Sequence, residues 1–268
     1  MDEKRVDSVL SDWRAPFPER EKSWEQLENK LQLNQRKKRS PRPWIAAASV
    51  AVLAGFVAVM SVNDGMDTIT AEAAEQLTHH LPDGSVVRLN AVSTLSYDEA
   101  DFESERYLNL EGEAYFQVEK GQTFTVHTVM GDITVLGTEF NVYSRNGKLE
   151  VQCTEGKVSV KDSDQEVLLT AGEQAISHDG FLSENKTEEA GIAWLEGRFE
   201  FDASPLAEVL DEVSRQFDVE IAHEGLDGMR FTGYFESTDL ETALGIICSP
   251  MGLEFGQTTD GRIEIERR

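Results

Sequence analysis

The amino-acid sequence predicts a mainly β body followed by a small α+β domain, with one transmembrane helix and a short helical arm in front. Three observations support this fold class. Short runs that alternate apolar and polar residues recur from about residue 72 to residue 181. Within the body, helix-period segments appear only after Trp194, and an uncharged stretch extends from Trp44 to Val62. The 268 residues suffice for one large or two modest domains.

The alternating runs predict the strands of the β body. Turn signals such as Asp83-Gly84, Gly131-Asp132 and Asn146-Gly147 separate them. Many short strands at intervals of roughly ten residues are typical of an all-β sandwich or of a β-solenoid-like stack, and the pattern fits both. The predicted strand regions are 85–97, 106–118, 124–129, 132–143, 148–161 and 165–176.

After Trp194 the pattern changes to that of a doubled β-α-β unit over residues 197–268. Strands are expected at 197–201, 218–223 and 230–236, and a closing hairpin at 253–257 and 262–266. Helices are expected at 205–217 and 240–252 because apolar residues recur there with a helical period. The predicted inward residues are Leu206, Val209, Leu210, Val213 and Phe217 in the first helix, and Leu240, Ala243, Leu244 and Ile247 in the second.

The segment from Trp44 to Val62 is predicted to span a membrane. As a helix it would be about 28 Å long, which matches the hydrocarbon core of a bilayer. A buried helix of a soluble protein and a cleaved signal peptide are the alternatives, but the residues before Trp44 are too many for a signal peptide. The basic residues lie on the N-terminal side and predict a cytoplasmic N-terminus: Arg36, Lys37, Lys38, Arg39 and Arg42.

The predicted organisation is therefore a cytoplasmic arm at 1–43, a transmembrane helix at 44–62, a periplasmic β domain at 63–193 and a C-terminal α+β domain at 194–268. Two short amphipathic helices are expected in the arm, which is too small to form its own core. Their apolar faces predict a surface for a cytoplasmic partner, although a membrane-surface or disordered arm fits as well. The predicted partner-binding residues are Val9, Leu10, Trp13, Trp24, Leu27 and Leu31.

Charge and motifs narrow the function classes. Residues 1–43 contain 11 basic and 8 acidic side chains, a balance of +3, so the remainder of the chain has −25 − 3 = −28. Direct binding of nucleic acid by so acidic a body is not expected. Cys153 and Cys248 lie in different predicted domains and are expected to be buried small side chains. We find no catalytic motif, metal-ligand spacing or cofactor motif, which favours a binding and signalling module.

Several stretches resemble one known family. They are LPDGSVVRLNAVSTLSY at 81–97, LEGEAYFQV at 110–118, FTVHTVMGDITVLGTEFNVY at 124–143, GKVSV at 156–160, AGEQA at 171–175 and WLEGRFEFDASPLAEVLDEVSRQFDVEI at 194–221. Together they resemble the FecR-type transmembrane anti-sigma factors of Gram-negative bacteria, in the form with a C-terminal domain that is common among Bacteroidetes. DGS, GEAYF, LGTEF and AGEQA are specific in this order, whereas each alone is weak.

The resemblance implies a function and two partners. Members of this family hold an extracytoplasmic-function sigma factor at the inner membrane, and their periplasmic part receives a signal from an outer-membrane TonB-dependent receptor. The C-terminal domain resembles the signalling domain at the N-terminus of such receptors. The arm of this chain is shorter than that of many members. The alternative from another class is a membrane-anchored periplasmic scaffold or glycan-binding protein without a cytoplasmic partner.

The resemblance also draws attention to Gly137 and Thr138, because some members split their periplasmic domain at a Gly-Thr bond. In that reaction the threonine hydroxyl attacks the preceding carbonyl, and the resulting ester is hydrolysed. A glycine before the nucleophile suits such a strained peptide. The alternative is a glycine at a β-bulge followed by an ordinary strand threonine.

Overall fold

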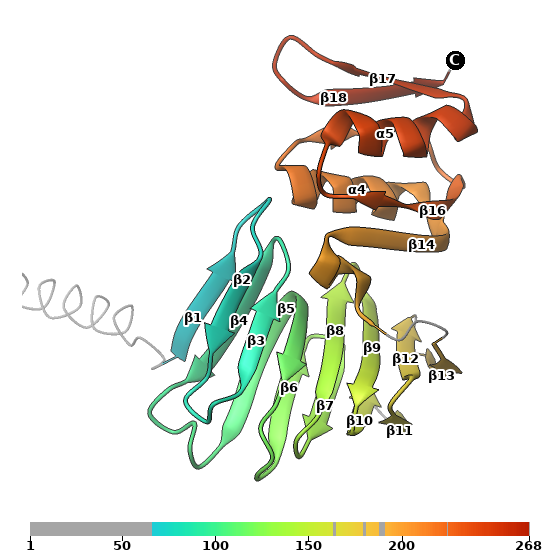
Figure 1. Cartoon of the computed structure of the whole chain (residues 1–268). Helices are drawn as coiled ribbons and strands as arrows, with labels where there is room; N and C mark the ends of the chain where they lie inside the picture. Colours follow the sequence, from blue (N-terminus) through green and yellow to red (C-terminus); the bar gives the residue numbers. More distant parts are fainter. Residues whose placement is uncertain (1–65, 163–164, 179–180, 188–190, 224, 268) are drawn as a thin grey trace, which may run out of the picture. The chain divides into compact units, whose positions relative to one another are not determined.

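The computed structural model describes residues 66–162, 165–178, 181–187, 191–223 and 225–267 (Figure 1). The arm and the predicted span at 44–62 lie outside these residues. Among the helices of the described part, none combines the length and apolar character that a bilayer crossing requires. The described chain is mainly β, with two α-helices and two short 3₁₀ turns. This confirms the predicted mainly β character of the body.

The β domain is built from thirteen strands that form one continuous sheet in the described residues. Each predicted run contains at least one strand, and β1, β2 and β13 were not among the predicted runs. The strands are β1 (Met66–Ala71), β2 (Leu77–His80), β3 (Val86–Leu89), β4 (Ser93–Asp98), β5 (Arg106–Gln117), β6 (Phe124–Thr128), β7 (Gly131–Val135), β8 (Glu139–Arg145), β9 (Lys148–Glu155), β10 (Lys157–Asp162), β11 (Gln165–Thr170), β12 (Glu173–His178) and β13 (Phe181–Lys186).

The long strand β5 joins two layers of this sheet. Its first half pairs with β4 and β6, whereas its second half pairs with β3 and β8. Gly112 lies at the change of layer with φ of 112°, and a Cβ there would approach Ser93 to 2.6 Å. Within the β domain only β5 and β6 pair in parallel among the described strands. The other pairs of this sheet are antiparallel.

The core of the β domain lies between the two layers and is apolar. Alternate residues of each strand point inward, as a period of two requires. Phe116 and Phe140, from neighbouring strands, stack with their ring centroids 5.0 Å apart. Phe124 meets Phe116 edge to face at 6.2 Å. Aromatic pairs of this kind stabilise a core beyond the area they bury.

The C-terminal domain follows a 3₁₀ turn, η1 (Ala193–Glu196). Its two β-α-β units are interleaved, because β14 pairs with β16 and β15 pairs in parallel with β18. The predicted doubled unit is therefore present in chain order, but its strands form two small sheets. The elements are β14 (Arg198–Pro205), α4 (Leu206–Phe217), β15 (Ile221–Ala222), β16 (Arg230–Glu236), α5 (Leu240–Cys248), η2 (Ser249–Met251), β17 (Leu253–Gln257) and β18 (Ile263–Arg267).

Two boundaries in this domain differ from the prediction for local reasons. The strand expected at 218–223 shrinks to Ile221–Ala222, because Asp218 ends α4 in the left-handed conformation and the chain turns back before it can pair. The helix expected at 240–252 ends at Cys248, where Pro250 is part of a 3₁₀ turn. The predicted inward residues of both helices are buried, except that Phe217 and Leu240 are only partly buried.

Candidate functional site at the junction of the two domains

The predicted site residues fall into two groups. Gly137 and Thr138 are described, between β7 and β8, whereas the predicted partner-binding residues lie outside the described residues: Val9, Leu10, Trp13, Trp24, Leu27 and Leu31. Gly137 has φ of 146°, and a Cβ there would come within 2.7 Å of the Lys120 backbone. Thr138 is buried, and its hydroxyl donates to the Lys157 carbonyl at 2.9 Å. This backbone is one that only glycine adopts without strain.

Two histidines and both cysteines of the chain lie in surroundings that a structural role explains. His79 Nε2 lies 2.8 Å from the Tyr97 hydroxyl, and His127 Nδ1 lies 2.6 Å from an Asp132 carboxylate oxygen. Cys153 and Cys248 are buried and free, as expected for small core side chains. Within the described ranges, no three histidine, cysteine or acidic side chains cluster as metal ligands.

The most polar part of the interior lies where the β domain meets α4 and η1. Trp194 of η1 is buried, and its indole Nε1 donates to Asn141 Oδ1 at 3.0 Å. Asn141 Nδ2 in turn donates to Glu113 Oε1 at 2.9 Å. One hydrogen-bonded relay therefore leads from the segment between the domains to a carboxylate on β5.

A second relay reaches the same carboxylate from α4. Gln216 Nε2 donates to Asn90 Oδ1 at 3.0 Å, and Asn90 Nδ2 donates to Glu113 Oε2 at 2.8 Å. The same Gln216 nitrogen also donates to Glu212 Oε1 at 2.8 Å. Both oxygens of Glu113 are thus bonded to amides that are themselves bonded to the C-terminal part of the chain. We call Glu113, Asn90, Asn141, Trp194 and Gln216 the junction network.

Glu113 is electrostatically unusual. Its burial, followed by the nearby Glu212 carboxylate, raises its pKa to about 7, although the bonds from Asn141 and Asn90 and the charge of Arg145 act in the opposite direction. Burial disfavours the charged form of a carboxyl group. Glu113 therefore exchanges its proton near neutral pH, inside the contact between the two domains.

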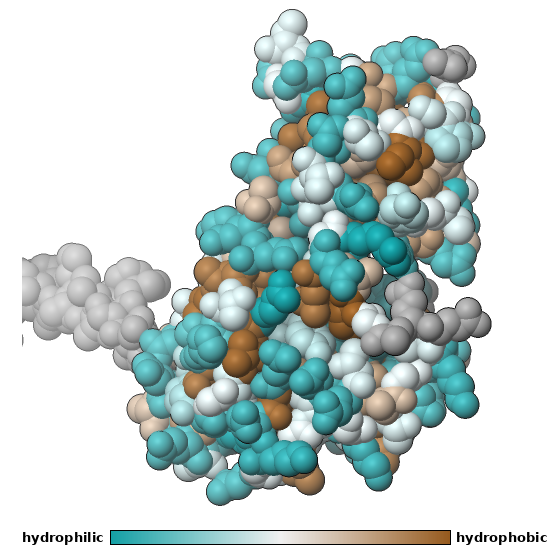
Figure 2. Space-filling model, viewed as in Figure 1, coloured by the Kyte–Doolittle hydropathy of each residue, from teal (hydrophilic) through white to brown (hydrophobic). Residues whose placement is uncertain are grey.

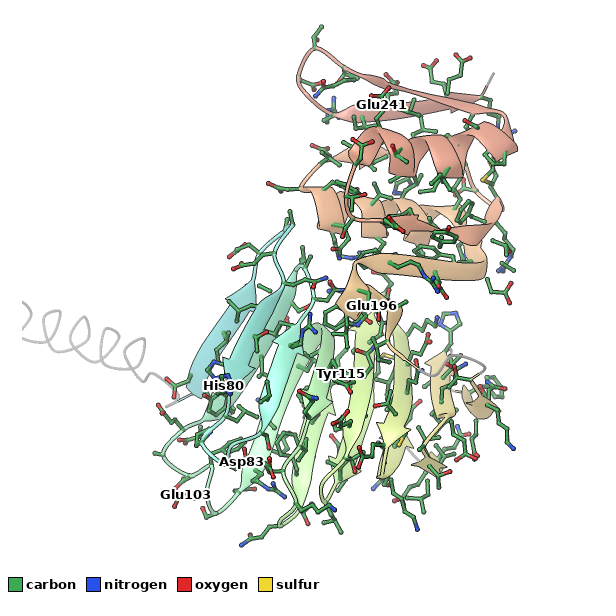
Figure 3. The ribbon with its side chains drawn as sticks, viewed as in Figure 1. His80, Asp83, Glu103, Tyr115, Glu196 and Glu241 are labelled. Carbon is green, nitrogen blue, oxygen red and sulfur yellow. The ribbon has the colours of Figure 1, made fainter. Side chains whose placement is uncertain are left out.

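Backbone and aromatic contacts hold the same junction. Ala74 N donates to the Arg215 carbonyl at 2.8 Å, and Gln76 Nε2 donates to the Trp194 carbonyl at 3.2 Å. Tyr115 of β5 belongs to the apolar core of the C-terminal domain, and its hydroxyl donates to Glu139 Oε2 at 2.7 Å. Figure 3 marks Tyr115 on β5 below Glu196 of η1. Directional bonds and shared core therefore fix the orientation of the two domains.

Two arginines flank the network, one on each side of the junction. Arg215 of α4 bonds Glu212 through Nε at 3.1 Å and Nη2 at 2.6 Å. Arg145, at the end of β8, donates to the carbonyls of Val92 and Ala91, each at 2.7 Å. Burial and the charge of Arg215 lower the pKa of Arg145. The two guanidinium groups therefore repel each other across the junction.

The sequence analysis did not identify these residues as a site. Glu113, Asn90, Asn141 and Gln216 belong to no motif for chemistry. The one available signal is the residue pair Glu113 and Tyr115, which share one face of β5 within the quoted stretch 110–118. The arrangement couples the protonation of the Glu113 carboxyl group to the contact between the two domains.

Comparisons with known proteins agree with this architecture. Residues 67–159 match the family model described as FecR protein, and residues 198–265 match the model described as FecR, C-terminal. Two crystal structures of proteins proposed to be anti-sigma factors, from Parabacteroides distasonis ATCC 8503, each superpose with a TM-score of 0.70. The first is 28% identical and the alignment covers 76% of this chain and 99% of that one; the second is 27% identical, with 75% and 99% covered.

No curated protein matches the chain. The two family models adjoin the junction from opposite sides, since the first includes Glu113 and Asn141 and the second includes Glu212 and Gln216. The chain therefore belongs to the FecR family and consists, in its described part, of a FecR domain followed by a FecR C-terminal domain.

Proposed function

We propose that the chain is an anti-sigma factor, a regulator that binds a sigma factor and controls it in response to a signal. The observation that supports this most strongly is the likeness to two solved proteins proposed to be anti-sigma factors, which extends over 99% of those chains. The family assignment agrees with it. A regulatory role agrees with the family assignment.

The sigma factor is of the extracytoplasmic-function class, and the arm at 1–43 binds it. Support comes from the two apolar stripes with Trp13 and Trp24, on a segment too short to bury them alone. The chain is anchored in the inner membrane by residues 44–62, with its N-terminus in the cytoplasm and its body in the periplasm. The basic residues before Trp44 support this orientation.

The signal comes from an outer-membrane TonB-dependent receptor and is received in the periplasm, where the C-terminal domain docks the receptor's signalling domain. Its small sheets leave strand edges that can accept a further strand, β17 among them. The body is acidic in sequence, and the face that Figure 2 presents is mostly hydrophilic, with hydrophobic residues gathered in places. A signal arriving at the C-terminal domain has to cross the junction network before it reaches the β domain and the membrane.

The decisive experiment is co-purification of the full-length chain with the sigma factor encoded next to its gene. Replacing both Trp13 and Trp24 by Ala is expected to weaken binding by a few kcal/mol, which is typical of hot-spot residues. Ser8→Ala with Ser11→Ala changes the opposite face of the first helix and serves as the matched control. Retention of the sigma factor at wild-type strength by the tryptophan double mutant would contradict the proposed surface.

Deleting residues 1–39 separates this function from the alternative. A membrane-anchored scaffold or glycan-binding protein would keep its activity after the deletion, whereas a sigma regulator would lose control of transcription. For the orientation, alkaline phosphatase fused after Arg268 should be active. An inactive fusion there, with an active one at the N-terminus, would reverse the topology.

Cleavage between Gly137 and Thr138 belongs to the same proposal. The positive φ of Gly137 and the burial of Thr138 support it, because the bond is held in a conformation that other residues avoid. Denaturing electrophoresis of the purified chain should then give fragments 1–137 and 138–268, which Thr138→Ala should prevent. If the wild-type chain stays intact for as long as the Thr138→Ala mutant, the bond is not cleaved and Gly137 only shapes the backbone.

A further inference from the structure

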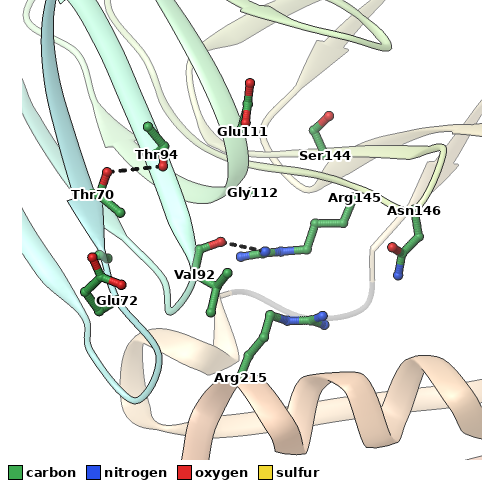
Figure 4. A pocket seen from close by; sticks show the side chains of 11 residues that line it. Thr70, Glu72, Val92, Thr94, Glu111, Gly112, Ser144, Arg145, Asn146 and Arg215 are labelled. Carbon is green, nitrogen blue, oxygen red and sulfur yellow. Dashed lines mark hydrogen bonds between the residues drawn. The ribbon is translucent and has the colours of Figure 1, made fainter. Parts of the chain in front are cut away.

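A groove opens beside the junction network, at the end of the β domain that faces α4 (Figure 4). Its volume is about 370 Å³, in the range of small-ligand sites. The β domain supplies most of its walls, and Arg215 is the one contribution of α4. The lining residues that bear on a ligand are Thr70, Glu72, Thr94, Glu111, Arg145 and Arg215.

The groove contains an arginine whose charge has no carboxylate partner at ion-pair distance within the described residues. All the bonds of Arg145 go to uncharged acceptors, namely the carbonyls of Val92 and Ala91 and the Ser93 hydroxyl. Its Nε is buried and has no hydrogen-bond partner. In a chain with a net charge of −25, an arginine left without an acidic partner is unexpected.

The groove contains a second guanidinium, that of Arg215, which is paired with Glu212. Arg215 directs Nε and Nη2 to Glu212, while its charge lowers the pKa of Arg145 across the groove. Glu212 and Glu113 offset part of the repulsion. An anion bound between the two guanidinium groups would relieve the rest, because Arg145 Nη1 uses only one of its two N–H groups and the bonds of Arg215 to Glu212 leave its Nη1 for a ligand.

The remaining walls favour one kind of anion. Thr70 and Thr94 supply hydroxyls 3.3 Å apart, and Asn146 supplies a side-chain amide. Glu72 and Glu111 line the groove as exposed carboxylates, which would repel a multiply charged phosphate more strongly than a singly charged group. A planar carboxylate therefore fits the donors and the charge better than a phosphate does.

We propose that this groove binds a carboxylate group, held by Arg145 of the FecR domain and Arg215 of the FecR C-terminal domain. The carboxylate belongs either to a small free acid or to an acidic residue of an extended peptide. Because the two arginines come from different domains, a bound carboxylate stabilises their contact. This site requires neither a sigma factor nor a receptor, so it goes beyond the proposed function.

The test is calorimetric titration of the purified full-length chain with two probes at constant ionic strength. The first probe is butyrate, a singly charged carboxylate, compared with butyramide, which has the same skeleton without charge. The second is an acetylated, amidated peptide with one central Glu, compared with the same peptide containing Gln. At least one acid is expected to bind tenfold or more tightly than its neutral analogue, and which acid does so identifies the source of the carboxylate.

Variants assign the binding to the groove. Arg145→Lys keeps the charge but removes the guanidinium fork, and should weaken binding at least tenfold. Thr70→Glu places a carboxylate on an exposed groove position of β1, and should abolish binding of the added acid while raising the thermal midpoint. Thr68→Glu is the matched control, because Thr68 is exposed on the same strand but does not line the groove.

Three results would overturn the proposal. The acids and their neutral analogues could bind equally or not at all. Thr70→Glu could bind the preferred acid as well as Thr68→Glu does. Arg145→Lys could bind with unchanged affinity. Because Thr70 and Thr68 are both exposed, neither substitution is expected to prevent folding, so the comparison remains informative even where Arg145→Lys is unstable.

Discussion

The interior of the β domain and the junction network are both buried, yet different forces hold them together. The interior is a set of apolar side chains, such as Phe116 and Phe140, whose burial is favourable in any direction. The junction contains a carboxyl group, amides and an indole nitrogen, which are stabilised only while each bond is made. The comparison suggests that the β domain provides the stability of the body, while the junction sets the orientation of its two domains.

The largest effect is expected in the apolar interior. Phe116 is fully buried and stacks on Phe140, so Phe116→Ala removes many contacts and leaves a cavity. The free energy of unfolding should fall by about 3–5 kcal/mol. Denaturant unfolding of the purified chain measures this change in free energy. Val129→Ala is the control, because Val129 is 90% exposed and its substitution should change the free energy of unfolding very little. A loss no larger than that of the control would mean that this core does not provide the stability.

A smaller effect is expected in the junction, but with a local consequence. Asn141→Ala leaves both Glu113 Oε1 and Trp194 Nε1 without the hydrogen bond that Asn141 makes to each, which should cost about 1–3 kcal/mol. Faster hydrogen exchange in α4 should accompany the loss, because the relay to the C-terminal domain is broken. Asn109→Ala, on the outer face of β5, is the control. Unchanged exchange in α4 would argue that the shared core alone orients the domains.

The smallest effect is a dependence on pH. The pKa of Glu113 is raised in the folded protein from 4.5 to about 7, so the folded state binds more protons than the unfolded state between these values. The contribution of Glu113 to stability is therefore fully present below pH 4.5 and is lost as pH rises through 7, by about 1 kcal/mol from pH 6 to pH 8. Glu212, Arg145, Arg215 and Tyr143 are the ionisable groups near it.

Glu113→Gln tests the assignment of this pH dependence. The glutamine side chain does not ionise, so the decline in the free energy of unfolding between pH 6 and pH 8 should disappear. Unfolding measured at both pH values tests this. Asp239→Asn, which changes an exposed cap of α5 with a lowered pKa, should leave the decline unchanged. An identical slope in wild type and Glu113→Gln would assign the titration to another group.

Local sequence patterns predicted much of the fold because their causes are local. The strand at 230–236 and the helix α4 follow from periodicity and from residues that end each element. Sequence patterns did not predict the short β15 or the interleaved sheets of the C-terminal domain. Pairing between distant strands leaves no signature in the strands themselves. For the same reason the alternation in β5 could not reveal that Glu113 would be covered.

The sequence by itself determined the mainly β body, the α+β end, the acidic charge and the glycine at 137, since each depends on composition, period or conformational preference. Only the tertiary structure decided that the second half of β5 is buried on both faces, so that the carboxylate of Glu113 became the centre of the junction network. It also brought Arg145 and Arg215, 70 positions apart, to one groove. The physical reason is that burial and electrostatic repulsion depend on which surfaces meet, and that is a property of the packed domains.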